Sequence, residues 1–428
     1  MQVLLNKLGF NKKTFIRFFL VVANSQLIYA FIALRSVLYD PMVAALGVTH
    51  TQFGVLMGFI GFISTFGGAA IGWLQDRFSV RKILAINSFM YGTWALVMAL
   101  WPACPYALKC LFFISFGFNA DAMYWATVLK SVRTMAREDK QATAFGIMES
   151  FRGIWEFLTN ALGVAIYTFM GSTILGMRTA MGVNATITIL SGLLIWLFIP
   201  EENQQGVDKG TEKTRMAFAG FLKVLRMPAV WMTGLAASCV YATFCAVNTY
   251  FVPYLQNVYL LPAALVGVFG LVNGSVTRMT AGPVAGIIAD MKFKSSAHLM
   301  RMCYMILIPL LIVVMIMPKS PSLVIPAMVL LLLVAIFCFL IRGVYYAPIG
   351  EMGVPTEISA AAMSVAAFIG YSPSFWAYPV YGMLIDKFAP ETAYRMIFMI
   401  LIVLAVLGVV LNTLIGRKVV ARRASAQK

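Results

Sequence analysis

The sequence predicts an all-helical membrane protein with twelve transmembrane helices arranged as two six-helix halves. Three observations lead to this prediction: an apolar composition, a regular series of apolar segments, and one long polar stretch near the middle of the chain. Of the 428 residues, 61% are hydrophobic and 11% are charged, and the mean hydropathy is +0.86. Soluble domains contain roughly 45–50% apolar and about 25% charged residues, so this composition excludes a soluble enzyme and a secreted disulfide-rich protein.

Twelve apolar segments have the length of about 20 residues that a helix needs to cross the hydrocarbon layer. The segments of the first half cover residues 15–39, 52–74, 82–101, 105–130, 143–168 and 177–199. Those of the second half cover residues 228–252, 261–289, 297–317, 321–343, 358–385 and 392–415. The predicted domains are therefore 1–199 and 228–428, and the polar residues 200–227 between them are predicted to be a cytoplasmic linker.

The positive charges are distributed unevenly between alternate connections. Lys and Arg are concentrated in the N-terminal segment, in every second connection and in the C-terminal segment. The opposite connections hold only Lys109, Arg178, Lys319, Lys387 and Arg395. By the positive-inside rule, both termini are expected in the cytoplasm of a multi-pass plasma-membrane protein, with the bacterial inner membrane as the expected location. The net charge of +17 is therefore a topology signal and does not indicate nucleic-acid binding.

No arrangement of residues in the sequence predicts a cofactor. The six cysteines are scattered, without a CxxC pair or a histidine at metal-ligand spacing, so no metal site is expected. A disulfide between Cys104 and Cys110 is one alternative to free thiols. The sequence also has no nucleotide-binding loop and no nucleophile with a base at usable spacing, so no enzymatic activity is expected.

The two halves carry a similar short motif at equivalent positions. The second span is followed by Gly72-Trp-Leu-Gln-Asp76-Arg77-Phe-Ser-Val-Arg81-Lys82, and the eighth by Gly286-Ile-Ile-Ala-Asp290-Met-Lys-Phe-Lys. The glycine and the aspartate recur half a chain length apart. This recurrence is typical of duplicated six-helix halves.

The first of these motifs resembles the signature between helices 2 and 3 of the major facilitator superfamily, with Ser79 where the family usually has glycine. Together with the twelve spans and the central linker, the resemblance covers nearly the whole chain. It implies that Asp76, Arg77 and Arg81 take part in a gate that closes the cytoplasmic side. The alternative is that these charges only set the topology.

Arg35 is a charged residue that lies late in the first apolar span. An ionisable group at the centre of a helix costs about 2.5–3.5 kcal/mol on insertion scales, so it needs a partner or a water-filled cavity. The segment resembles span 1 of the organophosphate antiporters and of the anion/cation symporters that carry sugar acids, where an arginine at this place contacts the substrate anion. The resemblance implies that Arg35, with Tyr29 beside it, binds substrate. The alternative is an arginine that reaches the outer interface.

Asp121 is predicted near the middle of the membrane, because it follows Lys109 by about 18 Å along span 4. It falls where the sugar-acid symporters of that family place a glutamate. Burial favours the neutral form of a carboxyl group, so Asp121 is predicted to bind and release a coupled proton. Permanent pairing with an arginine is the alternative. Trp125, one turn later, is a further substrate-site candidate.

Span 5 carries Glu149, Arg152 and Glu156 on one helical face, because they are spaced i, i+3 and i+7. Arg278 of span 8 is predicted near mid-depth, as a substrate-binding residue or as a charge partner of span 5. The resemblance implies that helices 5 and 8 meet between the halves, where such a pair would hold one conformation. Glu149 is a second proton-coupling candidate, and its local pairing with Arg152 is the alternative.

The remaining gating candidates are Arg133, Arg152, Asp290 and Arg342. For Arg342, near the end of span 10, Glu351 and Glu357 in the following loop are the candidate partners. Phe244 falls where the organophosphate antiporters carry a second arginine in span 7, which disfavours a dianionic phosphate ester.

The sequence thus predicts a secondary active transporter that moves a small organic anion, for example a sugar acid, together with protons by alternating access. The expected partners are the anionic substrate, protons and membrane lipids, and the chain is expected to act as a monomer. The alternatives are an uncoupled exchanger or facilitator of organic anions or phosphate esters and, from another class, a non-transporting membrane sensor.

Overall fold

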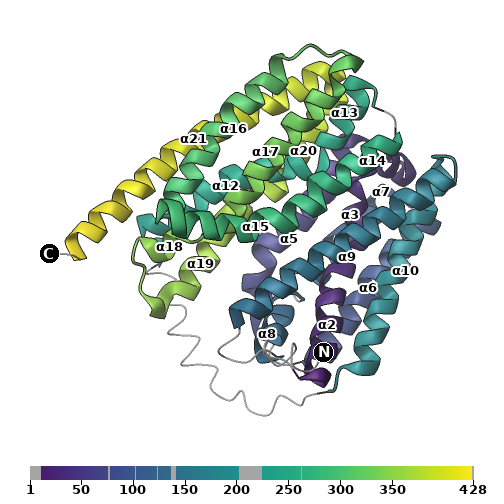
Figure 1. Cartoon of the computed structure of the whole chain (residues 1–428). Coiled ribbons are helices and arrows are strands. Elements are labelled where there is room, and N and C mark those ends of the chain that lie inside the picture. Colours follow the sequence, from purple (N-terminus) through teal and green to yellow (C-terminus); the bar gives the residue numbers. More distant parts are fainter. Residues whose placement is uncertain are drawn as a thin grey trace. The chain divides into compact units, whose positions relative to one another are not determined.

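The computed structural model describes residues 11–75, 78–101, 103–122, 124–135, 141–201, 224–261 and 263–426 (Figure 1). Nearly all of these residues are helical, and none of the described residues forms a β-strand. The chain divides into unit 1, which comprises Met1–Gly206 and Pro262–Met279, and unit 2, which comprises Val207–Leu261 and Thr280–Lys428. Every predicted span has a helical counterpart, so the predicted all-helical, twelve-span fold is confirmed.

Unit 1 contains the helices of the first six spans and part of span 8. Its first elements are α2 (Lys12–Leu27), α3 (Ala30–Ala33), the 3-10 helix η1 (Leu34–Ser36), α4 (Tyr39–Leu46), α5 (His50–Gln75) and α6 (Val80–Leu100). Next come α7 (Tyr106–Gly117), the π-helix η2 (Phe118–Ala122), α8 (Trp125–Met135), α9 (Gln141–Phe169) and α10 (Ile174–Phe198). The part of span 8 consists of α14 (Ala263–Leu271) and the π-helix η4 (Val272–Val276).

Unit 2 contains most of the helices from the second half of the sequence. They are α12 (Pro228–Thr249), α13 (Phe251–Tyr259), α15 (Thr277–Ile288), whose first residues belong to unit 1, the π-helix η5 (Ala289–Phe293), α16 (Ser296–Ile316) and η6 (Pro321–Leu323). The last elements are α17 (Val324–Val344), α18 (Pro348–Glu351), α19 (Thr356–Tyr371), α20 (Pro373–Lys387) and α21 (Pro390–Ala426).

Six of the described helices are long and apolar enough to cross a membrane by themselves, and two further candidates are bent helix pairs. The first bent pair is span 1, whose parts Lys12–Leu27 and Ala30–Ser36 meet at 51°. A polar run precedes the bend, and in it Ser25 Oγ donates to the carbonyl of Val22 at 2.7 Å. Side-chain bonding of this kind competes with the helical backbone and bends helices, which explains why the span breaks at Tyr29.

Spans 4 and 8 each contain a π-helical turn. Directly after η4, Thr277 Oγ1 donates to the carbonyl of Val272, five residues back, at 2.9 Å. In η2, Asn119 Nδ2 donates to Ser115 Oγ at 2.9 Å, and Asp121 lies in the same turn. A π-turn inserts an extra residue into a helix and is frequent at functional sites. The turn in span 4 therefore redirects the side chain of Asp121 relative to a regular helix.

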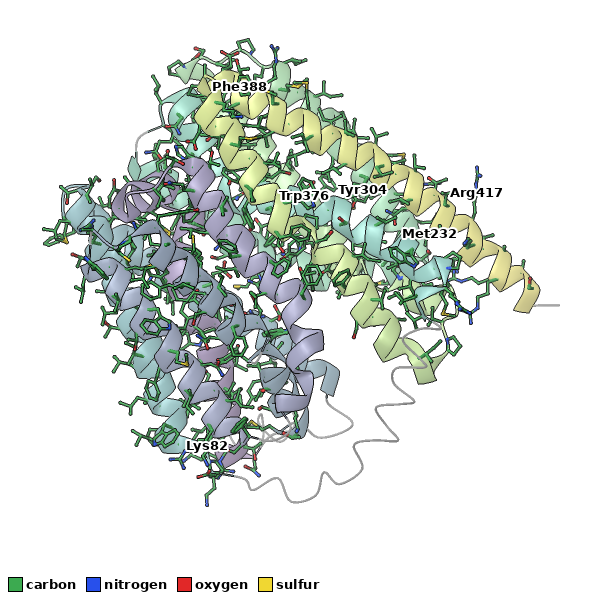
Figure 2. All side chains as sticks on the ribbon, turned by 180° about the vertical axis from the view of Figure 1, so that it is seen from behind. Lys82, Met232, Tyr304, Trp376, Phe388 and Arg417 are labelled. Atoms are coloured by element: carbon green, nitrogen blue, oxygen red, sulfur yellow. The ribbon has the colours of Figure 1, made fainter. Side chains whose placement is uncertain are left out.

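Each unit is held together by close packing between helices distant in sequence. In unit 1, α10 packs along α6 and α2 packs along α9 (Figure 1). In unit 2, α16 packs along α21. The buried Tyr304 of α16 donates to the carbonyl of Ala236 in α12 at 2.9 Å (Figure 2). A Cβ at Gly408 would lie 2.6 Å from the Tyr304 ring, so this crossing requires glycine.

Candidate substrate and proton site

The break in span 1 brings Tyr29 to Asp121 of span 4. The Tyr29 hydroxyl donates to Asp121 Oδ1 at 2.7 Å and lies 3.0 Å from the carbonyl oxygen of Ala120. Ser64 of α5 also hydrogen-bonds this carboxylate. Three helices of unit 1 therefore converge on one acidic side chain. Of the two substrate-site aromatics proposed from the sequence, Tyr29 is the one in direct contact with the proton-coupling candidate.

Arg152 of α9 lies within electrostatic range of Asp121. Its guanidinium lies 4.4 Å from the centroid of the Trp125 ring and donates to Glu149 Oε1 at 2.9 Å. The sequence analysis grouped Arg152 with the gating residues, whereas its neighbours here are the substrate and proton candidates. Trp125 thus joins the site through Arg152, because a cation above an aromatic face is attracted to the ring.

Arg278 forms two ion pairs with residues of span 5, the second of the two roles considered for it in the sequence analysis. Its NH1 donates to Glu156 Oε2 at 2.8 Å, and its NH2 lies 3.6 Å from Glu149 Oε2. The Glu156 side chain is 8% exposed and the Glu149 side chain 48%, so the pair with Glu156 is the better shielded of the two. Gln26 of α2 also donates to Glu156 Oε2, at 3.3 Å. These contacts join the charged side chains of α9 to one another, and Gln26 links them to span 1.

A second network of hydrogen bonds links span 1 to neighbouring helices of unit 1. The amide of the buried Asn24 donates to Ser88 Oγ at 2.9 Å and to Ser191 Oγ at 2.8 Å, and its oxygen accepts a short hydrogen bond from Tyr124. These bonds join α2 to α6, α10 and the start of α8. Sequence reasoning missed Asn24, Gln26 and Ser64. The polar run from Asn24 to Gln26 inside an apolar span was the available signal.

Arg35 is 9% exposed and lies in η1. Its NH1 donates to the carbonyl of Ile32 at 2.7 Å, which holds the side chain close to its own helix. Arg35 and Asp121 both lie within electrostatic range of the buried Tyr91 hydroxyl. Arg35 is therefore near the same region of unit 1 as the Tyr29–Asp121 pair, and its role in substrate binding stays a prediction.

The cytoplasmic gating candidates are only partly described by the structure. Asp76 and Arg77 lie outside the described residues, and so do the side chains of Arg133 and Asp290. The guanidinium of Arg81 lies 4.5 Å from the centroid of the Trp196 ring. The gating roles of these residues therefore remain predictions.

Lys82 lies at the exposed start of α6 (Figure 2) and pairs with Glu201. The hydrogen bond and charge of Lys82 lower the pKa of the Glu201 carboxyl group. The pair therefore forms above the ordinary pKa of a glutamate and is lost as the pH falls through the lowered value. Exposed pairs contribute little to stability, which fits a topology role for Lys82.

In unit 2, the expected partner of Arg342 has a different role. The Glu351 carboxylate accepts hydrogen bonds from Ser295 Oγ and from the backbone N–H of Ser296, each at 2.7 Å. Glu351 thereby caps the N-terminus of α16, where a negative charge is favourable. Arg342 instead lies 3.7 Å from the centroid of the Phe244 ring. The side chain of Glu357, the other expected partner, is outside the described residues.

Comparison with known proteins places this fold in a group of transporters. The family model described as the Major Facilitator Superfamily matches residues 14–377. The chain is 27% identical over 413 residues to the inner membrane protein YihN of Escherichia coli strain K12, covering 96% of this chain and 97% of YihN. It is 26% identical to the inner membrane protein YqcE of the same strain, over 88% of each chain.

Solved transporter structures share the fold. A bacterial homologue of the human lysosomal transporter Spinster aligns with a TM-score of 0.78 at 16% identity, over 96% of this chain and 99% of that chain. A D-xylose–proton symporter aligns with a TM-score of 0.73 at 13% identity, over 94% of this chain and 96% of that chain.

The helical membrane fold, together with these matches, defines a multi-pass membrane transporter and not an enzyme. The chain belongs to the Major Facilitator Superfamily. The family predicted from the Asp76 motif is thus confirmed, while the cytoplasmic placement of both termini stays a prediction.

Proposed function

We propose that this transporter is a secondary active symporter that moves a small organic anion together with a proton by alternating access. The observation that carries the proposal is the hydrogen bond of Tyr29 to Asp121, next to the charge of Arg152. Ionised, Asp121 accepts hydrogen bonds and attracts Arg152. Protonated, it loses that attraction, so one proton changes the electrostatics of the whole cluster.

The charge balance of unit 1 supports coupling between a proton and an anion. Three carboxylates and three arginines lie in this part of the unit: Asp121, Glu149, Glu156, Arg35, Arg152 and Arg278. With all six ionised, the charges cancel. A proton on Asp121 leaves one excess positive charge, which favours the entry of an anion. Proton and anion then favour each other's binding by the same free energy, as linkage requires.

Arginine is suited to the anion side of this mechanism. A guanidinium presents a planar fork of N–H donors that matches a carboxylate, and it keeps its charge across the physiological pH range. Arg35 and Arg278 are the proposed anion-binding arginines, with Tyr29 and Trp125 as the adjacent aromatic surface. The pair of Arg278 with Glu156 is proposed to stabilise one conformation of the transporter. Substrate that competes for Arg278 would weaken this pair.

An uncoupled exchanger or facilitator remains the second candidate, since the same arginines would serve it. Proteoliposomes distinguish the two. Binding is first measured by the thermal shift of the purified protein with gluconate, glucuronate, benzoate and glucose 6-phosphate, because a ligand of the folded state raises its melting temperature. The anion that binds is then offered to liposomes with an inward proton gradient. We expect accumulation above the external concentration, abolished by a protonophore. Uptake that only equilibrates would support the facilitator.

A further inference from the structure

Arg342 occupies an unusual environment near the end of α17. Its guanidinium carbon lies 3.7 Å from the ring centroid of Phe244, 5.4 Å from that of Tyr241 and 5.7 Å from that of Phe339. The residue sits in the last turn of a span whose remaining residues are apolar. Aromatic faces therefore surround a permanent positive charge within unit 2.

Tyrosine hydroxyls extend this environment. The hydroxyls of Tyr345 and Tyr371 are 3.0 Å apart, and the Tyr371 ring meets the Tyr241 ring edge-on at a centroid distance of 4.9 Å. Tyr346 stacks on Tyr345 at 4.1 Å, and its buried hydroxyl has no hydrogen-bond partner among the described residues. We call these rings the aromatic cluster; it consists of Tyr241, Phe244, Phe339, Tyr345, Tyr346 and Tyr371.

Arg342 forms no ion pair with any side chain that the structure describes. Its buried Nε also has no hydrogen-bond partner among the described residues. Glu351, the nearest described carboxylate along the chain, is used by Ser295 and Ser296. A cation inside a membrane span is costly and is normally matched by an opposite charge. The aromatic faces offset part of this cost but accept no hydrogen bond from Nε.

We propose that Arg342 and the aromatic cluster bind the carboxylate of an organic anion whose ring packs against the tyrosines. The proposal rests on the proposed function and adds to it a binding site in unit 2 that sequence analysis had assigned to gating. The anion would supply the missing counter-charge, the guanidinium fork would hold the carboxylate, and the hydroxyls of Tyr345, Tyr346 and Tyr371 would meet polar groups on the ring.

The test measures anion binding to the full chain in lipid nanodiscs by thermal shift, with potassium glucuronate and potassium benzoate as probes and potassium chloride at equal ionic strength as reference. Wild type is expected to show a saturable rise in melting temperature with at least one probe. In Arg342→Gln, we expect the half-saturating concentration to rise about tenfold or more, because a charged hydrogen bond is lost.

Three variants make the result specific. Arg422→Gln is the matched control, because Arg422 bonds the carbonyls of Gly350 and Glu351 outside the cluster; its binding curve should match wild type. Arg342→Lys keeps the charge but loses the fork, and should bind more weakly than wild type even if Arg342→Gln does not fold. Arg35→Gln tests the proposed site in unit 1 separately.

Unchanged binding in both Arg342 variants overturns the inference. If Arg35→Gln then abolishes binding, the proposed function stands without a site at Arg342. If wild type shows no shift with either probe, the anionic substrate class is wrong and the inference fails with it.

Discussion

The hydroxyl of Tyr29 donates to Asp121 across 2.7 Å, and this bond joins the break in span 1 to the π-helical turn in span 4. Both local irregularities are needed for the contact. A straight span 1 would carry Tyr29 past the site, and a regular helix in span 4 would turn Asp121 to another direction. The two irregular turns thus serve one acidic side chain, which is why the proposed proton site is placed there.

Tyr29→Phe should shift the pH midpoint of anion binding. The change keeps the ring and removes a hydrogen bond to a charged group, which contributes about 1.5–3 kcal/mol. We therefore expect the pH midpoint of anion binding to move by about one unit or more. Thermal shift at a series of pH values measures the midpoint. Tyr106→Phe is the control, because the Tyr106 hydroxyl donates to the backbone carbonyl of Gln52 and has no proposed role in coupling. Equal midpoints in wild type and Tyr29→Phe would contradict the assigned role.

Glu156→Gln should destabilise the protein more than Glu149→Gln. Removing one partner of a buried pair costs about 3–5 kcal/mol, and the partial exposure of Arg278 places this change near the lower limit. Glu149 is half exposed, so its loss should cost about 0–1 kcal/mol. Melting temperatures of the two variants in nanodiscs give the comparison. A larger loss for Glu149→Gln would show that the contacts of Glu149 with Arg152 and Arg278 stabilise the protein more than the pair of Glu156 with Arg278 does.

Gly270→Ala should destabilise the packing of span 8 within unit 1. The added Cβ would lie 2.8 Å from the carbonyl oxygen of Ser36 and 2.9 Å from Val37 Cγ1, and overpacking of this kind costs about 1–3 kcal/mol. At Gly286 an added Cβ meets nothing within 4 Å, so Gly286→Ala is the matched control. Its melting temperature should equal or exceed that of wild type. Equal stability of both variants would mean that α14 does not approach η1 so closely.

Arg35→Gln should abolish anion uptake while leaving expression and the melting temperature close to those of wild type. The substitution removes a charge proposed to bind substrate, and glutamine keeps an N–H donor that can replace the bond of Arg35 NH1 to the carbonyl of Ile32. Arg178→Gln is the control, because Arg178 donates to the carbonyl of Ala45 and has no proposed role in transport. Normal uptake of gluconate by Arg35→Gln would exclude Arg35 from the substrate site.

The sequence predicts the spans of this protein well because each depends on local composition. The spacing of Glu149, Arg152 and Glu156 places these residues on one helical face, and the family resemblance offered Arg278 as a partner for that face. The sequence does not predict that Glu351, at the end of α18, caps α16, because no local pattern states which of two distant groups a carboxylate will bind.

The π-helical turn around Asp121 is equally invisible in the sequence. It arises from how span 4 packs, and Gly117 beside it allows α7 to approach α5 so closely that a Cβ would lie 2.8 Å from Ile63. Gln26 was missed for a different reason. A single amide in an apolar span gains meaning only when the structure shows Glu156 within reach.

The most direct test of the account compares Asp121→Asn with Asp40→Asn in proteoliposomes that face an inward proton gradient. Asp40 lies in the first turn of α4 and has no proposed role in coupling. Asn resembles the protonated carboxyl group, so Asp121→Asn should still exchange labelled anion across the membrane but should not concentrate it. Asp40→Asn should concentrate it as wild type does. If Asp121→Asn liposomes also concentrate the anion, the proton is carried elsewhere and the central claim is wrong.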